Sequence, residues 1–177
     1  MPTTRNRRPP RRSLAWLLAL AVTALLASGI YQANSTSEPA ALPQVSPTLD
    51  ALDDMTVTLT AEDTAVELTV KHASTPQQRA RGLQHVAAMP DDYGVLFTFD
   101  EPTDAGFWMR DTLLELDLAF VADDGHIVAI ETLTPCAADP CPTTAPDVPY
   151  VAVLEMHAGW FAAHGFATGD VLTARAY

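Results

Sequence analysis

The sequence of 177 residues contains one lysine and two cysteines, and it lacks the motifs that identify common active sites. There is no glycine-rich phosphate-binding loop and no G-x-S-x-G nucleophile motif. Neither cysteine has a suitable base near it in the sequence, so a cysteine nucleophile is not indicated. We therefore assign no catalytic residue, no metal ligand and no cofactor from the sequence.

Charged side chains are absent from Ser13 to Ile30, and the twelve residues before Ser13 hold five arginines and no acid. This pattern is typical of an export segment rather than of part of a fold. The small residues Ala27, Ser28 and Gly29 suit a signal peptidase, whereas 14–30 approaches the ~17 residues that just span a bilayer. A cleaved signal peptide and an uncleaved membrane anchor over residues 1–30 both stay open. In either case we expect the rest of the chain to be extracytoplasmic, secreted or anchored to the cell membrane.

Basic residues are scarce in the part of the chain that would be exported. Five of the ten lysines and arginines lie in the first twelve residues, and all 22 acids come later. The remainder therefore has five basic residues against 22 acids, a net charge of −17 with histidine neutral. Such a surface repels phosphate backbones and anionic headgroups. We expect no nucleic-acid partner, and contact with a membrane only through the N-terminal segment.

Residues 31–54 have little apolar content to bury and contain Pro39, Pro43 and Pro47. This composition predicts a disordered linker. A single globular domain is then expected over 55–177, which is long enough to build a core.

The domain is expected to consist mainly of strands. Leu114, Leu116, Leu118 and Phe120 alternate with polar or small residues, which is typical of a strand that is buried on one face. A turn at 123–125 follows, and then a second strand, so a hairpin is predicted. Similar patterns predict further strands over 55–59, 66–70, 95–99, 150–156 and 171–175. We predict an antiparallel β sandwich or partly closed barrel of about seven or eight strands, with one or two short helices.

One helix is predicted from Pro76 to His85. Thr75 can cap it, Pro76 is tolerated at the first helical position, and Gln78 can complete a capping box. A shorter helical turn is expected near Trp160, ending at Gly165.

Six motifs, taken together, resemble the family called domain of unknown function 192. They are Arg81-Gly82-Leu83, Gly94-Val95-Leu96-Phe97, Phe107-Trp108-Met109-Arg110-Asp111-Thr112, Leu116-Asp117-Leu118-Ala119-Phe120, Pro140-Cys141-Pro142 and Ala158-Gly159-Trp160. The resemblance covers about Val66 to Val171. The chain departs from the family pattern at Gln84, Asp111 and Glu115, where methionine, asparagine and proline are usual. The resemblance implies a compact, mainly β domain, and it supplies no activity and no catalytic residue.

Cys136 and Cys141 are five residues apart in a loop that contains three prolines. In an exported domain this arrangement predicts a disulfide. A metal site and a redox-active pair are the alternatives, although the spacing is not the two-residue gap of those motifs.

The candidate ligand-binding residues are Trp108, Arg110, Asp111 and Asp117, all within or beside the central strand. Asp117 lies between two leucines, so if buried it needs donors, which Arg110 or backbone amides of a neighbouring loop could supply. Asp111, Glu115 and Asp117 would share one face if the strand were unbroken, and could then bind a hard cation or share acid/base work. The alternative is that they form the solvated face of the strand.

Other candidates have simpler interpretations. Trp108, Met109 and Trp160 could line an apolar pocket, but we interpret them as core residues. Arg79 and Arg81 are interpreted as surface residues that offset nearby carboxylates. The five histidines, His72, His85, His126, His157 and His164, are interpreted as isolated surface residues.

Three functional hypotheses follow. The first is a non-catalytic extracytoplasmic module that binds a small ligand or a protein through a groove around Trp108, Arg110 and Asp117. The second is a hydrolase or lyase that uses Asp111 or Asp117, with or without a divalent cation. The third is a stability or assembly accessory without a small-molecule site.

Overall fold

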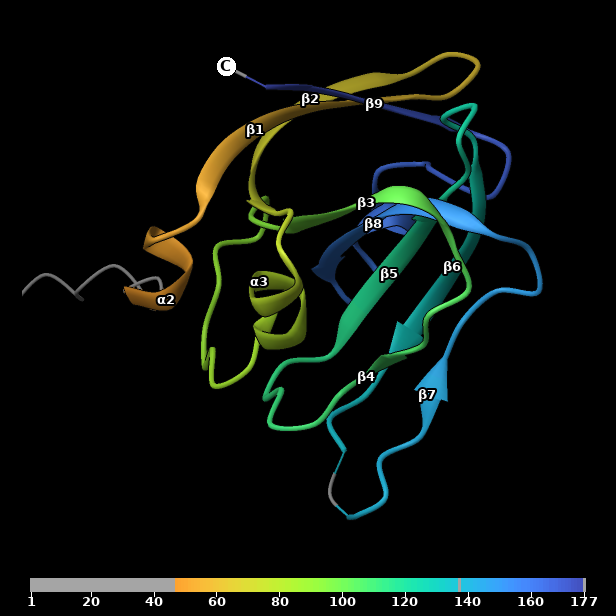
Figure 1. Cartoon of the computed structure of the whole chain (residues 1–177). Helices are drawn as coiled ribbons and strands as arrows, with labels where there is room; N and C mark the ends of the chain where they lie inside the picture. The colour runs from red at the N-terminus through yellow and green to blue at the C-terminus, as the bar shows by residue number, and fades with distance from the viewer. Residues whose placement is uncertain (1–46, 137, 177) are drawn as a thin grey trace, which may run out of the picture. The chain divides into compact units, whose positions relative to one another are not determined.

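The computed structural model describes residues 47–136 and 138–176 (Figure 1). The predicted export segment over 1–30 and most of the predicted linker lie outside these residues. Within the described ranges, no helix is both long and apolar enough to cross a membrane.

Nine strands and three short helices make up the described part of the chain. In chain order they are α2 (Pro47–Asp50), β1 (Asp53–Thr60), β2 (Ala65–Ala73), α3 (Pro76–Arg81), β3 (Val95–Thr103), β4 (Phe107–Trp108), β5 (Leu116–Val121), β6 (Ile127–Leu133), β7 (Thr143–Thr144), β8 (Tyr150–His157), α4 (Trp160–Ala163) and β9 (Val171–Ala176).

The main sheet has seven strands in the order β6-β5-β8-β3-β2-β1-β9, and β4 and β7 form a second, two-stranded sheet. The predicted mainly β fold is confirmed, with one difference in strand direction. β2 and β3 are parallel over three residue pairs, from Lys71 with Val95 to Ala73 with Phe97, because α3 and its following loop separate them. The sheet is therefore mixed. It is not closed into a barrel, although one isolated bridge between His126 and Val171 links its two edges.

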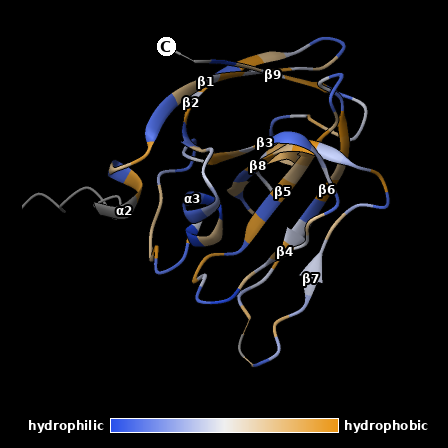
Figure 2. Cartoon of the chain, in the orientation of Figure 1, coloured by the Kyte–Doolittle hydropathy of each residue, from blue (hydrophilic) through white to orange (hydrophobic). Residues whose placement is uncertain are grey.

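Each face of the sheet carries its own hydrophobic cluster, because side chains alternate along every strand. On β8, Leu154 and Met156 belong to the cluster that includes Trp160 of α4. Val153, on the opposite face, packs in the cluster that includes Phe97. Figure 2 shows β5 as mostly hydrophobic with one hydrophilic segment, and α3 as mostly hydrophilic. β8 is thus buried on both sides, and a polar side chain on it must be accommodated inside the domain.

The predicted capping box at the start of α3 is confirmed. The Thr75 hydroxyl accepts a hydrogen bond from the Gln78 amide, and the Gln78 side chain accepts one from the Thr75 amide. The helix ends at Arg81 rather than at His85, so the predicted end is wrong. Gly82 has a φ of +46°, and a Cβ on it would lie 3.3 Å from the Phe97 ring. The chain therefore leaves the helix at a glycine, because the positive φ and the close Phe97 ring disfavour any side chain there.

The folded domain begins earlier than predicted. Leu49 of α2 is fully buried in the same cluster as Phe97, and β1 begins at Asp53. Residues 47–54, which were predicted to belong to the linker, are therefore part of the folded domain. A single buried leucine in a proline-containing segment has no periodicity, which is why the sequence pattern missed it.

Candidate functional site

Trp108 is the exposed end of a two-residue strand whose other side chain is in the core. Phe107 makes edge-to-face contacts with Phe97 and Phe120, with ring centroids 5.3 and 5.8 Å apart. Because side chains alternate along a strand, Trp108 then points outward, and it is 46% exposed. The interpretation of Trp108 as a core residue is therefore wrong, whereas Met109 and Trp160 are buried as expected.

Arg110 lies against the exposed Trp108 ring. Its guanidinium carbon is 4.8 Å from the ring centroid, a cation–π distance. The guanidinium also forms an ion pair with Asp139 of the cysteine loop. Its buried Nε–H has no hydrogen-bond partner among the residues that the structure describes. The tryptophan and the arginine therefore form a fixed stacked pair at the surface.

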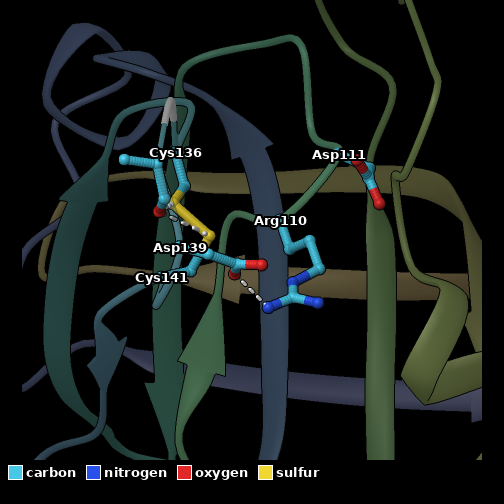
Figure 3. A pocket seen from close by; sticks show the side chains of 6 residues that line it. Arg110, Asp111, Cys136, Asp139 and Cys141 are labelled. Atoms are coloured by element: carbon cyan, nitrogen blue, oxygen red, sulfur yellow. Dashed lines mark hydrogen bonds and ion pairs between the residues drawn. A yellow bond between two sulfur atoms is a disulfide. The ribbon is translucent and has the colours of Figure 1, made fainter.

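A hollow of about 280 Å³ lies beside this pair, and the cysteine loop forms its other side (Figure 3). Its lining includes Arg110, Asp111, Asp139 and both cysteines. The Cys136 and Cys141 sulfur atoms are 2.12 Å apart, which confirms the predicted disulfide pairing. Figure 3 shows the Asp111 carboxylate on the side of Arg110 away from the disulfide. Two of the four predicted binding residues, Arg110 and Asp111, therefore line one hollow.

Asp117 is not part of that hollow. It is 3% exposed, and its two carboxylate oxygens accept hydrogen bonds from the Thr132 hydroxyl at 2.6 Å and the Gly159 amide at 2.8 Å. Arg110 pairs with Asp139 instead, so the predicted bond between Arg110 and Asp117 is wrong. The second predicted source of donors, a backbone amide of a neighbouring loop, is the one that the structure contains. Asp117 therefore links β5 to Gly159, the N-cap residue of α4.

The predicted row of carboxylates does not form. Asp111 has a φ of 56° and lies outside β5, which begins only at Leu116, so the alternation of a strand does not extend to it. Asp111 and Glu115 are exposed, whereas Asp117 is buried. Among the described residues, no cluster of three or more histidine, cysteine, aspartate or glutamate side chains could hold a metal ion. The structure does not bring Asp111 and Asp117 into one cavity.

A second, smaller hollow of about 30 Å³ is lined by residues from the end of α3, from β4 and from the interior strand β8. Its lining includes Arg79, Arg81, Gly82, Leu83, Gln84, Phe97, Phe107, Trp108, Thr112 and Glu155. Glu155 is 6% exposed. Burial, which removes the carboxyl group from water, raises its pKa to about 8. Glu155 is therefore protonated at neutral pH.

Both arginines of α3 line this smaller hollow; Arg81 is an exposed residue, as interpreted from the sequence, whereas Arg79 is partly buried. The Arg79 guanidinium donates hydrogen bonds to the Ser74 carbonyl and, at 2.8 Å, to the Thr98 carbonyl. It also lies 4.7 Å from the centroid of the Phe99 ring. These contacts fix Arg79 in place beside the hollow.

Four of the five histidines have specific side-chain contacts and are not isolated. His126 Nδ1 lies 3.2 Å from the Asp124 carboxylate. His72 is hydrogen-bonded to the Thr98 hydroxyl at 2.8 Å, and burial lowers its pKa. His157 contacts the Met89 carbonyl at 2.9 Å. His164 stacks on Trp160 with centroids 4.0 Å apart. The His72 and His157 contacts join residues that are 26 and 68 positions apart, so sequence spacing could not indicate them, whereas His164 contacts a residue four positions earlier in the same helical turn.

Two solved structures share this fold. One is a protein from Sinorhizobium meliloti 1021, described as a candidate transcription regulator, with 35% identity and a TM-score of 0.63; the match covers 70% of this chain and 95% of that one. The other is a protein of unknown function from Novosphingobium aromaticivorans DSM 12444, with 30% identity and a TM-score of 0.66, covering 79% of this chain and 98% of that one.

No functionally curated protein matches the sequence. Residues 57–174 match the DUF192 family, which is described as an uncharacterised ACR family, and this range contains both hollows and the disulfide. The chain belongs to the domain of unknown function 192 family.

Proposed function

We propose that the folded domain is a non-catalytic, extracytoplasmic module that binds a small anionic ligand on the surface formed by Trp108, Arg110 and the two hollows beside them. The observation that carries this proposal is the exposed Trp108 ring with Arg110 stacked on it. Tryptophan and arginine are the residue types most enriched where binding energy is concentrated. A planar or apolar group can lie on the ring while the hollows receive polar groups.

The distribution of positive charge favours an anion. Beyond residue 29 the chain has only five basic residues, in a segment of net charge −17. Three of them, Arg79, Arg81 and Arg110, line the two hollows. Positive charge concentrated at one place on an acidic surface attracts anions there and repels them elsewhere.

Two features support the extracytoplasmic location. The five arginines before Ser13 and the uncharged stretch up to Ile30 form the pattern of an export segment. The disulfide between Cys136 and Cys141 belongs to an oxidising compartment. Fusing a reporter enzyme that is active only outside the cytoplasm to the C-terminus tests the location, and an inactive reporter would contradict it.

The description of the Sinorhizobium relative suggests a role in transcription, but this chain does not fit it. A DNA-binding domain neutralises phosphates with lysine and arginine. A net charge of −17 beyond residue 29 opposes that contact. We therefore propose a small-molecule ligand rather than nucleic acid.

Equilibrium dialysis against a mixture of small organic acids, with mass spectrometry of the retained compounds, tests the binding function. The full-length chain should retain compounds that the Trp108→Ala variant does not. Leu113→Ala is the matched control, since Leu113 is an exposed apolar residue that lines neither hollow. Equal retention by all three proteins would overturn the proposed site.

A further inference from the structure

Glu155 is a buried acid that lines the smaller hollow. It occupies the middle of β8, where the residues paired with it on the flanking strands are the apolar Val95 and Leu118. Throughout residues 47–136 and 138–176, no group forms a hydrogen bond or ion pair with its carboxyl group. Buried polar groups normally have such partners. A ligand group bound in the hollow would supply that partner.

The charged groups around this carboxyl come from one element. Arg79 and Arg81 of α3 line the same hollow, whereas β3, β4 and β5 present the apolar side chains of Phe97, Phe107 and Leu118 toward this side of β8. Two residues further along the strand, His157 is engaged by the Met89 carbonyl. The hollow therefore combines a carboxyl group at its wall with guanidinium groups and an exposed aromatic ring, and it has no anion of its own at neutral pH, because burial raises the Glu155 pKa to about 8.

We propose that this hollow receives the carboxylate of a small organic acid, with the Glu155 O–H donating a hydrogen bond to it and the body of the ligand resting on Trp108. This inference rests on the proposed binding function and names its ligand class. A neutral carboxylic acid can donate its O–H to a carboxylate, so the two groups share one proton. No bond to carbon is formed or broken. The α3 arginines stabilise the charge that the ligand brings.

The size of the hollow agrees with this assignment. A volume of about 30 Å³ is that of roughly two water molecules, since one needs about 10–15 Å³ measured in this way. A carboxylate end group fits this space, whereas a ring or a phosphate does not. The rest of the ligand must lie outside, and Trp108 is the exposed lining residue that offers it a flat surface.

Isothermal titration calorimetry of the full-length chain with sodium phenylacetate at pH 6.5 and 9.5 tests the proposal. Phenylacetate supplies a carboxylate and an aromatic body, and phenethylamine, with the same body and an ammonium group, is the control ligand. With a pKa of about 8, nearly all Glu155 is protonated at pH 6.5 and about one thirtieth at pH 9.5. The affinity for phenylacetate should therefore fall about 30-fold between the two pH values, and phenethylamine should not bind at either.

Two variants separate Glu155 from other groups that titrate. Glu155→Gln keeps a donor that cannot ionise, so its affinity for phenylacetate should be the same at both pH values. Glu155→Leu removes the donor and should weaken binding at pH 6.5 by about 10- to 100-fold, as expected when a hydrogen bond to a charged group is lost. Circular dichroism verifies that both variants are folded. An unchanged affinity in Glu155→Leu, or no binding of phenylacetate to the wild-type chain, would overturn the carboxylate assignment.

The same experiment distinguishes this inference from the proposed function. Trp108→Ala should lose phenylacetate binding, and Leu113→Ala should keep it. If Trp108→Ala loses binding while Glu155→Leu binds normally, the surface is a ligand site but the small hollow is not its carboxylate receptor. If neither variant changes the binding of phenylacetate, the ligand binds elsewhere and both proposals fail.

Discussion

Replacing Glu155 with glutamine should make the stability of the domain much less sensitive to pH. The side chain is almost completely buried, and burial raises its pKa from the ordinary value of 4.5 to about 8. In the unfolded chain the same carboxyl group is in water and ionises near pH 4.5. Between these two values the unfolded state has lost the proton and the folded state has kept it, so a rise in pH favours unfolding. Glutamine has nearly the same shape and no proton to lose.

The size of the effect follows from the two pKa values. Each pH unit between them changes the free energy of unfolding by about 1.4 kcal/mol. The stability that Glu155 provides is fully present below pH 4.5 and is lost progressively as the pH rises to about 8, a total of about 5 kcal/mol over about 3.5 pH units. The ionisation of Glu155 should lower the free energy of unfolding of wild type, relative to Glu155→Gln, by about 1 kcal/mol at pH 5 and by about 5 kcal/mol at pH 8.5.

Urea unfolding of the full-length chain, followed by circular dichroism at pH 5 and pH 8.5, measures this difference. All other titrating groups are common to the two proteins, so their contributions cancel when the two free energies are subtracted. From pH 5 to pH 8.5, the free energy of unfolding of the variant should increase by about 4 kcal/mol relative to that of wild type. A gain below about 1 kcal/mol would show that Glu155 is ionised, or is paired with a donor, in the folded protein.

Three further variants test the packing around the site. Asp117→Asn should destabilise the domain by about 1–3 kcal/mol in thermal or urea unfolding, because one of its two buried hydrogen bonds is lost, whereas the exposed Asp111→Asn should change stability by less than about 0.5 kcal/mol. Gly94→Ala should cost about 3 kcal/mol in urea unfolding, because the new Cβ would lie 2.3 Å from the Met156 sulfur atom; an unchanged midpoint would contradict this crowding. Burial lowers the pKa of His72 below its ordinary value of 6.5, so the stability that neutral His72 provides is present above pH 6.5 and is lost as the pH falls through the lowered pKa. In urea unfolding, wild type should therefore lose more stability than His72→Gln between pH 7 and pH 5. Equal losses in the two proteins would refute this.

The strands could be predicted because the periodicity of two is a local signal. Leu116, Leu118 and Phe120 share one face of β5 as the alternation predicts, but the opposite face is buried too, so the prediction of a strand buried on one face only is wrong. The capping box at Thr75 and Gln78 correctly marks the start of α3. Strand order is not a local property. The parallel pairing of β2 with β3 depends on a connection of more than twenty residues, and no pattern within either strand specifies it.

The central stretch shows why the candidate site could be predicted only in part. The concentration of aromatic and charged groups in this stretch indicates Trp108, Arg110 and Asp111 as candidates. Arg110 and Asp111 line the larger hollow, and Trp108 lines the smaller one. Trp108 was assigned to the core because bulky aromatic residues usually are buried. Its exposure depends on β4 being only two residues long, with Phe107 taking the buried side.

Glu155 and Asp117 present the same pattern in the sequence, a single acid inside an apolar strand, and the structure gives them different roles. The Asp117 carboxylate receives donors from Thr132, across the hairpin, and from Gly159, 42 residues further along the chain. Glu155 receives none, because its strand lies between β3 and β5 and the facing residues are Val95 and Leu118. A strand that reads as almost continuously apolar is buried on both faces, so an acid within it is costly unless something stabilises it. For Asp117 that stabilisation comes from the fold itself, whereas for Glu155 it comes from retaining a proton, which leaves a donor facing a hollow beside Trp108.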